Sequence, residues 1–492
     1  MHTRSYITKS GFMKGEQCDL AFYYWWNKTA EINTEAIQFR MDQGTAIGRL
    51  AQQLASGGSD LNDLQLPPWE LAAPTKSLMK KRLPIYEATF ITEIKPKLLC
   101  KVDMLVPDVK KGWEIWEVKS SGSVKEEHII DLAFQTYVAE ACGVKVSGIK
   151  LVHLNTDYVR NGNLDIQQLF QKEDVTKKVR NALTGLGDKI KDLYKTGKLK
   201  IAPQIPIGSH CFTPYACAYQ QICWKAFPPE NHIYMIPRLR NANELILAGI
   251  YSIKDIDPET LSDKQRLVQE AHIKQTIIMD PHSISNFFSD KVYPYYFFDF
   301  ETIMPAVPIW DGTRPYMQVP FQYSLHVIRE IGAEPEHYEF LDDANGADPR
   351  RPLVEQLIKD IGDNGTVWAY NKSFELARLR ELADVFKEHR NKLFTIIERL
   401  EDLITPFREQ WYYNPAMRGS NSIKNVLPVL VPELSYDALE IGSGGEAMDV
   451  FLKLVTGDKD AMMNKEQILN DLRKYCKLDT MAMVKIFLKL TE

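Results

Sequence analysis

Residues 293–303 read YPYYFFDFETI, an apolar run that carries two acidic residues. A run of this kind predicts a buried β-strand. Because side chains alternate along a strand, Asp299 and Glu301 point to the same face. Carboxylates in so hydrophobic a strand are costly to bury unless they bind something. The stretch therefore predicts a core strand whose two acids form part of a binding site.

Two downstream segments extend this acidic pair. AYNKSFELARL (369–379) places Glu375 at the start of a helix that follows a strand, and KYCKLDT (474–480) places Tyr475 and Asp479 on one face of a late helix. Four carboxylates can hold two divalent cations about 4 Å apart, an arrangement that clamps the attacking and leaving oxygens in phosphodiester cleavage. A tyrosine one turn from the last carboxylate can orient the attacking water. The group predicts a site for two Mg²⁺ or Mn²⁺ ions.

The order of these motifs resembles that of the DEDD exonucleases of the RNase H-like fold, in the subclass with a Tyr-x-x-x-Asp motif. The resemblance covers about residues 290–492 and implies digestion from 3′ to 5′. Glu375 stands where that family usually has Asp. Asp402 and Lys424 lie between the second and third motifs, where relatives have comparable residues near the substrate path. A solvated surface position is the alternative for both.

A second acidic group precedes this region. Asp103 lies in an expected strand at 98–108, and Glu117 and Lys119 share one face of the next, at 112–121. Two carboxylates hold a hard divalent cation, which activates water, while the lysine steadies the nucleophile or the phosphate. This is the D…(D/E)xK arrangement of metal-dependent nucleases. A salt-bridged surface hairpin is the alternative.

The chain has seven cysteines, an odd number that argues against a disulfide framework. Cys211, Cys217 and Cys223 are spaced six and six, and Cys18 lies far upstream. Four thiolates can bind an iron–sulfur cluster or zinc. Zinc ligands usually come in Cys-x-x-Cys pairs, and their absence favours a cluster. Buried unligated thiols are the alternative, which we expect for the remaining three cysteines, Cys100, Cys142 and Cys476.

One early cysteine, the D…ExK core and a late cysteine triplet together resemble the iron–sulfur RecB-like exonucleases, including CRISPR-associated RecB-like nucleases and the AddB nuclease domain. The resemblance covers about residues 1–228. It implies a PD-(D/E)XK fold, contact between Gln135 on the following helix and the site, and a [4Fe-4S] cluster that staples the ends of the domain. Gly48 stands near the place where many relatives carry a metal-binding histidine, and Glu87 is a further acidic candidate. The implied cluster ligands are Cys18, Cys211, Cys217 and Cys223.

Composition and charge fit these expectations. Of 492 residues, 45% are apolar and 25% charged, which is ordinary globular composition. Residues 1–228 carry 30 Lys and Arg against 24 Asp and Glu, whereas the remainder carries 30 against 41. A mildly basic half suits a polyanionic partner. Neither an apolar run of membrane length nor an apolar signal region is present, so we expect a cytoplasmic protein without membrane association.

The order of strands and helices predicts an α/β protein in three parts. These are a nuclease domain (1–228), a helical connector (229–285) and an exonuclease-like domain (286–492). Helices are expected at 39–56, 126–143, 373–386 and 465–490, and further strands at 145–155, 321–328 and 366–371.

The whole arrangement resembles an uncharacterised bacterial family that fuses an iron–sulfur RecB-like nuclease to a DEDD exonuclease-like domain. We expect a nuclease with two active sites that acts on single-stranded DNA or DNA ends. RNA processing is one alternative. The other is a nucleic-acid end-binding protein in which the Gly48 and Glu375 departures mark inactive sites. The sequence identifies no protein partner.

Overall fold

The computed structural model describes residues 4–29 and 35–492 of the chain. The chain forms two compact units. The first comprises residues 1–225 and 306–316, and the second comprises residues 226–305 and 317–492. Residues 229–285, expected as a separate connector, group with the second unit. Within the described part, no helix has both the length and the apolar character that a membrane crossing requires.

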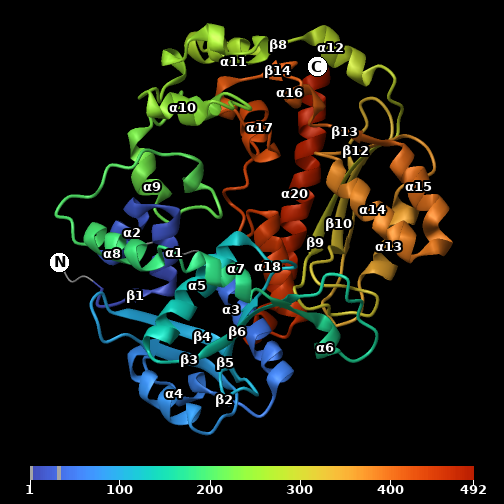
Figure 1. Cartoon of the computed structure of the whole chain (residues 1–492). Helices are drawn as coiled ribbons and strands as arrows, with labels where there is room; N and C mark the ends of the chain where they lie inside the picture. The colour runs from blue at the N-terminus through green and yellow to red at the C-terminus, as the bar shows by residue number, and fades with distance from the viewer. Residues whose placement is uncertain (1–3, 30–34) are drawn as a thin grey trace. The chain divides into compact units, whose positions relative to one another are not determined.

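The first unit is built on a mixed sheet (Figure 1). Its strands run in the order β2 (Ser59–Asp60), β3 (Ile85–Ile91), β4 (Leu98–Pro107), β5 (Trp113–Lys119), β6 (Val146–Leu154) and β7 (Phe170–Asp174), with β1 (Ile7–Thr8) alongside β4. Strands β3, β4 and β5 are antiparallel, whereas β5 and β6 are parallel and joined by α5 (Glu126–Ala141). The strands expected at 98–108, 112–121 and 145–155 and the helix expected at 126–143 are confirmed.

Helices cover both faces of this sheet. On one face, α5 packs against α1 (Lys9–Gln17), where the rings of Phe12 and Phe134 stack with centroids 4.9 Å apart. Helices α2 (Asp19–Trp26) and α8 (Leu186–Gly197) join this layer. Gly11 permits the close approach of α1 and α2, because a Cβ there would lie 2.2 Å from the Trp25 ring. On the other face, α3 (Glu35–Ala51) packs near Trp116.

The second unit contains a five-stranded sheet. Its order is β11 (Glu336–Leu341), β10 (Val319–Ile328), β9 (Tyr295–Ile303), β12 (Thr366–Ala369) and β13 (Leu400–Asp402). Strands β11, β10 and β9 are antiparallel, and β9, β12 and β13 are parallel. Figure 1 shows α20 (Lys465–Thr491) along one face and α13 (Arg350–Asp360), α14 (Ser373–Val385) and α15 (Arg390–Glu398) on the other. The expected strands and helices of this region are confirmed.

The pleat of β9 sorts its side chains between two cores. Tyr295 and Phe297 pack with residues of α20, whereas Tyr296, Phe298 and Phe300 pack with α13, α14 and α15. Asp299 and Glu301 continue the first set, so both carboxylates project towards α20. The alternation thus turns an apolar strand into a platform for acidic groups on one face only.

Shorter elements complete the described chain. In the first unit they are α4 (Ala72–Met79), α6 (Ile166–Leu169), α7 (Thr176–Ala182) and α9 (Gln220–Cys223). In the second they are α10 (Ala242–Leu247), α11 (Asp263–Lys274), β8 (Ile278–Met279), α12 (Pro281–Phe288), α16 (Thr405–Arg408), β14 (Tyr412–Tyr413), α17 (Ile423–Leu430), α18 (Gly444–Val455) and α19 (Lys459–Met463).

Removal of one ring between α1 and α5 tests the core of the first unit. Phe134 has no solvent exposure, so we expect Phe134→Ala to lower the free energy of unfolding by about 3–5 kcal/mol, through lost burial and a cavity. Urea unfolding followed by circular dichroism measures the change. Trp69→Ala, at a position 57% exposed, is the control and should leave the transition almost unchanged. Equal shifts for the two variants would contradict the assigned core.

Candidate functional site

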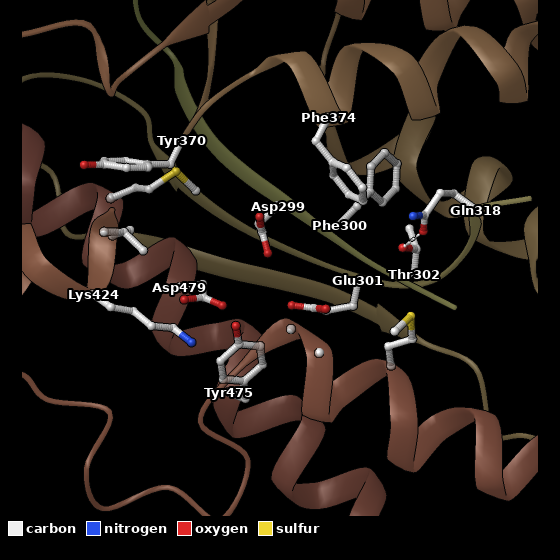
Figure 2. A pocket seen from close by; sticks show the side chains of 15 residues that line it. Asp299, Phe300, Glu301, Thr302, Gln318, Tyr370, Phe374, Lys424, Tyr475 and Asp479 are labelled. Carbon is white, nitrogen blue, oxygen red and sulfur yellow. Dashed lines mark hydrogen bonds between the residues drawn. The ribbon is translucent and has the colours of Figure 1, made fainter. Parts of the chain in front are cut away.

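A cavity of about 390 Å³ in the second unit is lined by three of the acidic residues singled out from the sequence, Asp299, Glu301 and Asp479 (Figure 2). Asp299 and Glu301 enter it from β9, and Tyr475 and Asp479 enter it from α20. Asp299 and Glu301 also bring carboxylate oxygens within 4.8 Å of the Cys476 sulfur and of each other. Two elements far apart in sequence therefore direct three carboxylates and a phenol into one space.

Hydrogen bonds from two tyrosines hold Asp479. Tyr436 and Tyr475 both donate to its carboxylate. Tyr475 is 4% exposed, and the Tyr436 ring lies 6.3 Å from it between centroids. Tyr436 was missed in the sequence, because it lies in a loop and its distance from Asp479 along the chain gives no local signal. The pair fixes the carboxylate while the Tyr475 hydroxyl remains at the cavity.

The carboxyl groups of this cavity favour their protonated forms in the absence of a cation. Burial raises the pKa of Asp479 to about 6, although the two tyrosines favour its charged form. Burial, followed by the charge of Asp479, holds the pKa of Asp299 and of Glu301 well above the ordinary range. Like charges so close together cannot all ionise without a counter-charge. A divalent cation would supply that charge.

Glu375 lies beside the cavity rather than in its lining. It is 3% exposed at the first turn of α14, and its Oε2 atom has no hydrogen-bond partner among the described residues. Burial raises its pKa to about 8, and its charge in turn contributes to the raised pKa of Asp299. A buried carboxylate oxygen without a donor is costly, so this atom fits a cation better than a structural contact.

A lysine and a helix start form the opposite wall. Lys424, on α17, lines the cavity and donates to the carbonyl of Gly442. Its ammonium lies 5.6 Å from the centroid of the Tyr475 ring. Gly444 begins α18, and a Cβ there would lie 3.5 Å from Glu301 Oε2. Lys424 and the first residues of α18 thus line the cavity together with the acidic cluster, and only the lysine was noted in the sequence.

Asp402, the other residue noted between the motifs, has local partners. Its Oδ1 accepts from the backbone N–H groups of Asn371 and Lys372, at 2.9 and 3.3 Å, and its Oδ2 accepts from Arg408 at 3.0 Å. It therefore holds the turn that leads into α14. In this position it supports Glu375 rather than the cavity itself.

The structure brings the four residues singled out in the first unit together. Lys119 donates to Glu117 Oε1 at 2.7 Å, and Gln135, from α5, donates to Glu117 Oε2 at 2.8 Å. The strand β4 contributes Asp103, whose Oδ2 accepts from the backbone N–H of Val118 at 2.8 Å. Burial and the Glu117 charge raise the pKa of Asp103 to about 8. Burial opposes ionisation of Glu117, but Lys119 and Lys9 hold its pKa well below the ordinary range.

Two charged residues of this site escaped the sequence analysis. Lys9, on α1, donates to Glu117 Oε1 at 2.8 Å, and Asp131, on α5, accepts from Lys119 at 2.5 Å. Asp131 precedes Gln135 by one helical turn and shares its face, a spacing that could have revealed it. Lys9 offers no such signal, because it lies more than a hundred residues before its partner.

Glu87 and Gly48 are the two other residues of the first unit that the sequence singled out. Glu87 takes a left-handed backbone conformation (φ 58°) on β3 and forms an ion pair with Lys101 at 2.9 Å. Its charge contributes to the raised pKa of Asp103, so it lies near the site. Gly48 lies on α3, and a Cβ added there would meet no atom within 4 Å. A side chain would therefore have room at this position.

The four cysteines singled out in the sequence line one small cavity. Cys18 caps the C-terminus of α1, and the other three come from residues 211–223. Gln17 ties the two segments together, because its amide donates to the carbonyls of His210 and Tyr215 at 2.8 and 2.7 Å. Burial, followed by the charges of the neighbouring thiols, raises the pKa of Cys223 to about 11.

The spacing of these thiols distinguishes between ligands. Among the described residues, no three of the four sulfur atoms lie within 4.8 Å of one another. Four sulfurs at about 2.3 Å from one zinc ion would lie about 3.8 Å apart. As placed, the four sulfurs therefore do not form a tetrahedral zinc site. Of the three cysteines expected to be buried, Cys100 lies in the first core and Cys476 lies beside Asp299 and Glu301. The expectation was wrong for Cys142, which is exposed near the end of α5.

The raised pKa values predict that metal-free protein loses stability as pH rises. Unfolded Asp and Glu ionise near pH 4, whereas folded Asp479 and Glu375 hold their protons to about pH 6 and 8. The folded state then binds more protons, so stability is lost from about pH 4 upwards through these values. Desolvation lowers the pKa values of His272, His326 and His337, which act in the opposite direction below about pH 6.5, so the carboxyl contribution is read as a difference. We expect the melting temperature of wild type in chelator to fall relative to that of Asp479→Asn between pH 5 and pH 8, and Mn²⁺ to reduce this difference.

Calorimetry at each pH measures this effect. Asp479→Asn removes one of the responsible groups and should flatten the profile relative to wild type. Parallel profiles for wild type and Asp479→Asn over this range would show that Asp479 is not protonated in the folded state.

The second unit matches one protein-family model. Residues 296–422 match the model described as "Domain of unknown function (DUF2779)". The matched span contains Asp299, Glu301 and Glu375 and ends before Tyr475 and Asp479.

Similar proteins carry names without functions. "Uncharacterized protein MG366 homolog" of Mycoplasma pneumoniae is 29% identical over 206 residues, which cover 39% of this chain and 31% of that protein. "Uncharacterized protein UU173" of Ureaplasma parvum is 28% identical over 225 residues, covering 40% and 31%. "Uncharacterized protein MG366" of Mycoplasma genitalium is 24% identical over 400 residues, covering 70% and 58%. The chain thus spans about a third of the first two relatives.

A search of solved structures found a match described as "Crystal structure of SSO0001". It has a TM-score of 0.23 and 12% identity, and it covers 45% of this chain and 87% of that chain. The family match is the finding that bears on the site: the chain is similar to a domain of unknown function over residues 296–422, which include Asp299, Glu301 and Glu375.

Proposed function

We propose that the chain is a metal-dependent nuclease with two active sites, which hydrolyses phosphodiester bonds in single-stranded DNA or at DNA ends. The observation that carries the proposal is the convergence of Asp299, Glu301 and Asp479 with the Tyr475 hydroxyl in one cavity. Buried carboxylates with raised pKa values and a specific charge partner mark functional sites. A divalent cation would neutralise these carboxylates, and divalent cations also activate water for phosphodiester hydrolysis.

The topology of the second unit supports an RNase H-like fold. In chain order its strands lie third, second, first, fourth and fifth, with the second antiparallel to the first and with β9, β12 and β13 parallel. The resemblance to DEDD exonucleases implies a fold of the RNase H-like class, with which this mixed sheet is compatible. On that reading β9 is the first strand and carries the Asp-x-Glu motif.

The residues of this cavity fit two divalent cations of the Mg²⁺ or Mn²⁺ type. Asp299, Glu301 and Asp479 would hold them, with the unpartnered oxygen of Glu375 as a further ligand. Bound cations would lower the pKa of water and neutralise charge on the phosphate. The protein's own part is to orient water through the Tyr475 hydroxyl and to balance phosphate charge through Lys424. Digestion would run from 3′ to 5′, as the resemblance implies.

The lining of the cavity favours an unpaired end. A volume of about 390 Å³ suits a single nucleotide rather than a duplex, which is about 20 Å wide and would need an open groove. Phe300, Phe374 and Tyr370 contribute aromatic surface to the wall. Aromatic faces stack on any base, so binding would tolerate different sequences.

The first unit supports a second nuclease site of the PD-(D/E)XK type. Three antiparallel strands, β3 to β5, lead through α5 to the parallel strand β6. Asp103 and Glu117 would hold a divalent cation, and Lys119 would steady the nucleophile or the phosphate. Gln135 holds Glu117 in place, and Glu87 is available near Asp103 as a further carboxylate.

We further propose that Cys18, Cys211, Cys217 and Cys223 bind a [4Fe-4S] cluster. The gathering of the four thiols at one cavity and the absence of Cys-x-x-Cys pairs support it, with zinc as the alternative. The cluster would tie α1 to the end of the unit. In this way it would supply stability rather than chemistry.

Strand cleavage tests the two-site proposal. Anaerobically purified protein is incubated with Mn²⁺ and single-stranded DNA labelled at either end. We expect Asp299→Ala to abolish products shortened from the 3′ end and Lys119→Ala to remove a different product ladder, because each variant disables one site. Lys195→Ala, an exposed lysine paired with Asp192, is the control.

Three outcomes decide between the alternatives. Loss of all products in either variant would mean a single composite site. Faster cleavage of a matched RNA oligonucleotide would favour RNA processing. DNA binding without cleavage by wild type would favour an end-binding protein.

Metal analysis and melting test the cysteine proposal. We expect brown protein with about four iron atoms per chain. Cys217→Ala should lose the iron and melt at lower temperature, because it removes one ligand of the staple. Cys142→Ala, at an exposed cysteine outside the cavity, is the control and should retain both properties. Stoichiometric zinc in a colourless preparation would replace the cluster with a zinc site, and equal melting shifts would refute the ligand assignment.

A further inference from the structure

Glu117 of the first unit has more positive partners than a metal ligand can keep. Two ammonium groups share its Oε1, Lys119 at 2.7 Å and Lys9 at 2.8 Å, while Gln135 donates to Oε2 at 2.8 Å. Glu117 is 1% exposed, so these donors satisfy a carboxylate that water cannot reach. A divalent cation at this carboxylate would have to displace one of the donors.

The two lysines are not held equally. Lys119 lies two residues from Glu117 on the same strand and also contacts Asp131 at 2.5 Å. Lys9 comes from α1, and its distance to Asp131 is 3.7 Å. Its side chain is 30% exposed, compared with 23% for Lys119. Lys9 thus has one ion pair shorter than 3 Å, a longer one to Asp131, and a side chain that is already partly exposed.

The position of Lys9 in its helix points the same way. It is the first residue of α1, whose first turn has no acidic residue. A cation at a helix N-terminus is repelled by the helix dipole. The ion pairs with Glu117 and, at longer distance, with Asp131 are therefore what hold Lys9 in the site, and a cation that takes over Glu117 removes the closer of the two. Repulsion between a divalent cation and an ammonium group a few ångströms away adds to it.

We propose that Lys9 is an exchangeable counter-charge of the first site: it neutralises Glu117 in the metal-free protein, leaves when a divalent cation binds, and then contacts a phosphate of the bound DNA. The inference rests on the proposed nuclease function of the first unit. It makes Lys9 a substrate-contacting residue that links metal binding to substrate binding, whereas Lys119 stays on Asp131 throughout.

The proposal predicts that loss of the Lys9 charge strengthens Mn²⁺ binding at the first site. Lys9→Met keeps the length of the side chain and removes its charge, so the competing cation is lost. We expect Mn²⁺ affinity at the first site to rise by about tenfold, the order expected for removal of one nearby positive charge. Affinity for a single-stranded oligonucleotide, measured in Ca²⁺, should fall at the same time. Lys9→Arg keeps the charge and should resemble wild type in both measurements.

Mn²⁺ binding is measured by calorimetry on the full chain carrying Asp299→Asn, which weakens the second site. Lys9→Gln, whose amide can still donate to Glu117, is a second neutral variant in case Lys9→Met does not fold. Lys195→Met is the control for loss of a surface charge. Unchanged or weaker Mn²⁺ binding in both neutral variants, with normal binding in the parent, would overturn the role of Lys9 alone. No Mn²⁺ binding at this site in the parent would overturn the proposed first active site as well.

Discussion

The cost of burying negative charge is the constraint on which both units depend. Each places carboxylates where water has little access, and each must neutralise them. The first unit does so with its own cations, since Lys119 and Lys9 lie against Glu117 and Asp131. The second unit has fewer: Lys424 is the cation that lines its cavity within the described chain. There, protons replace the missing charge, as the raised pKa values of Asp299, Glu301 and Asp479 indicate.

This difference sets how each site would respond to metal. In the second unit a divalent cation would displace protons, so its binding should strengthen as pH rises. In the first unit a cation would displace an ammonium group, an exchange that is less sensitive to pH because lysine stays charged over the ordinary range. The two sites use similar ligands, but their affinities for a divalent cation would therefore depend differently on pH.

Local patterns were enough to locate the elements that carry the motifs. An apolar run predicted β9, alternation predicted β5, and helical spacing predicted α5 and α20, because each pattern is set within a few residues. The gathering of Cys18 with the later triplet was expected only by resemblance to a family, since spacing alone does not relate residues so far apart. The structure places all four at one cavity.

The rest depended on long-range contacts. Lys9 looks like an ordinary surface residue in the first turn of a helix, and Tyr436 lies in a loop, so neither gives a periodic signal. Asp402 was noted for its place between two motifs, but its hydrogen bonds show that it supports a turn. Residues 229–285 look like a linker because they are polar and broken by Gly249 and Pro258, yet they contribute buried side chains such as Ile253 and Val268 to the second unit.

The loop between β9 and β10 has a consequence for dissecting the protein. Residues 306–316 belong to the first unit, where Arg160 donates to the Pro308 carbonyl at 3.0 Å and Ala306 enters the core beside Trp116. The chain therefore leaves the first unit after residue 225 and returns to it before completing the second. Neither unit is encoded by one uninterrupted stretch of the gene. A shortened chain that stops near residue 225 would lack part of its own core, and insolubility of such a fragment would say nothing about the intact protein.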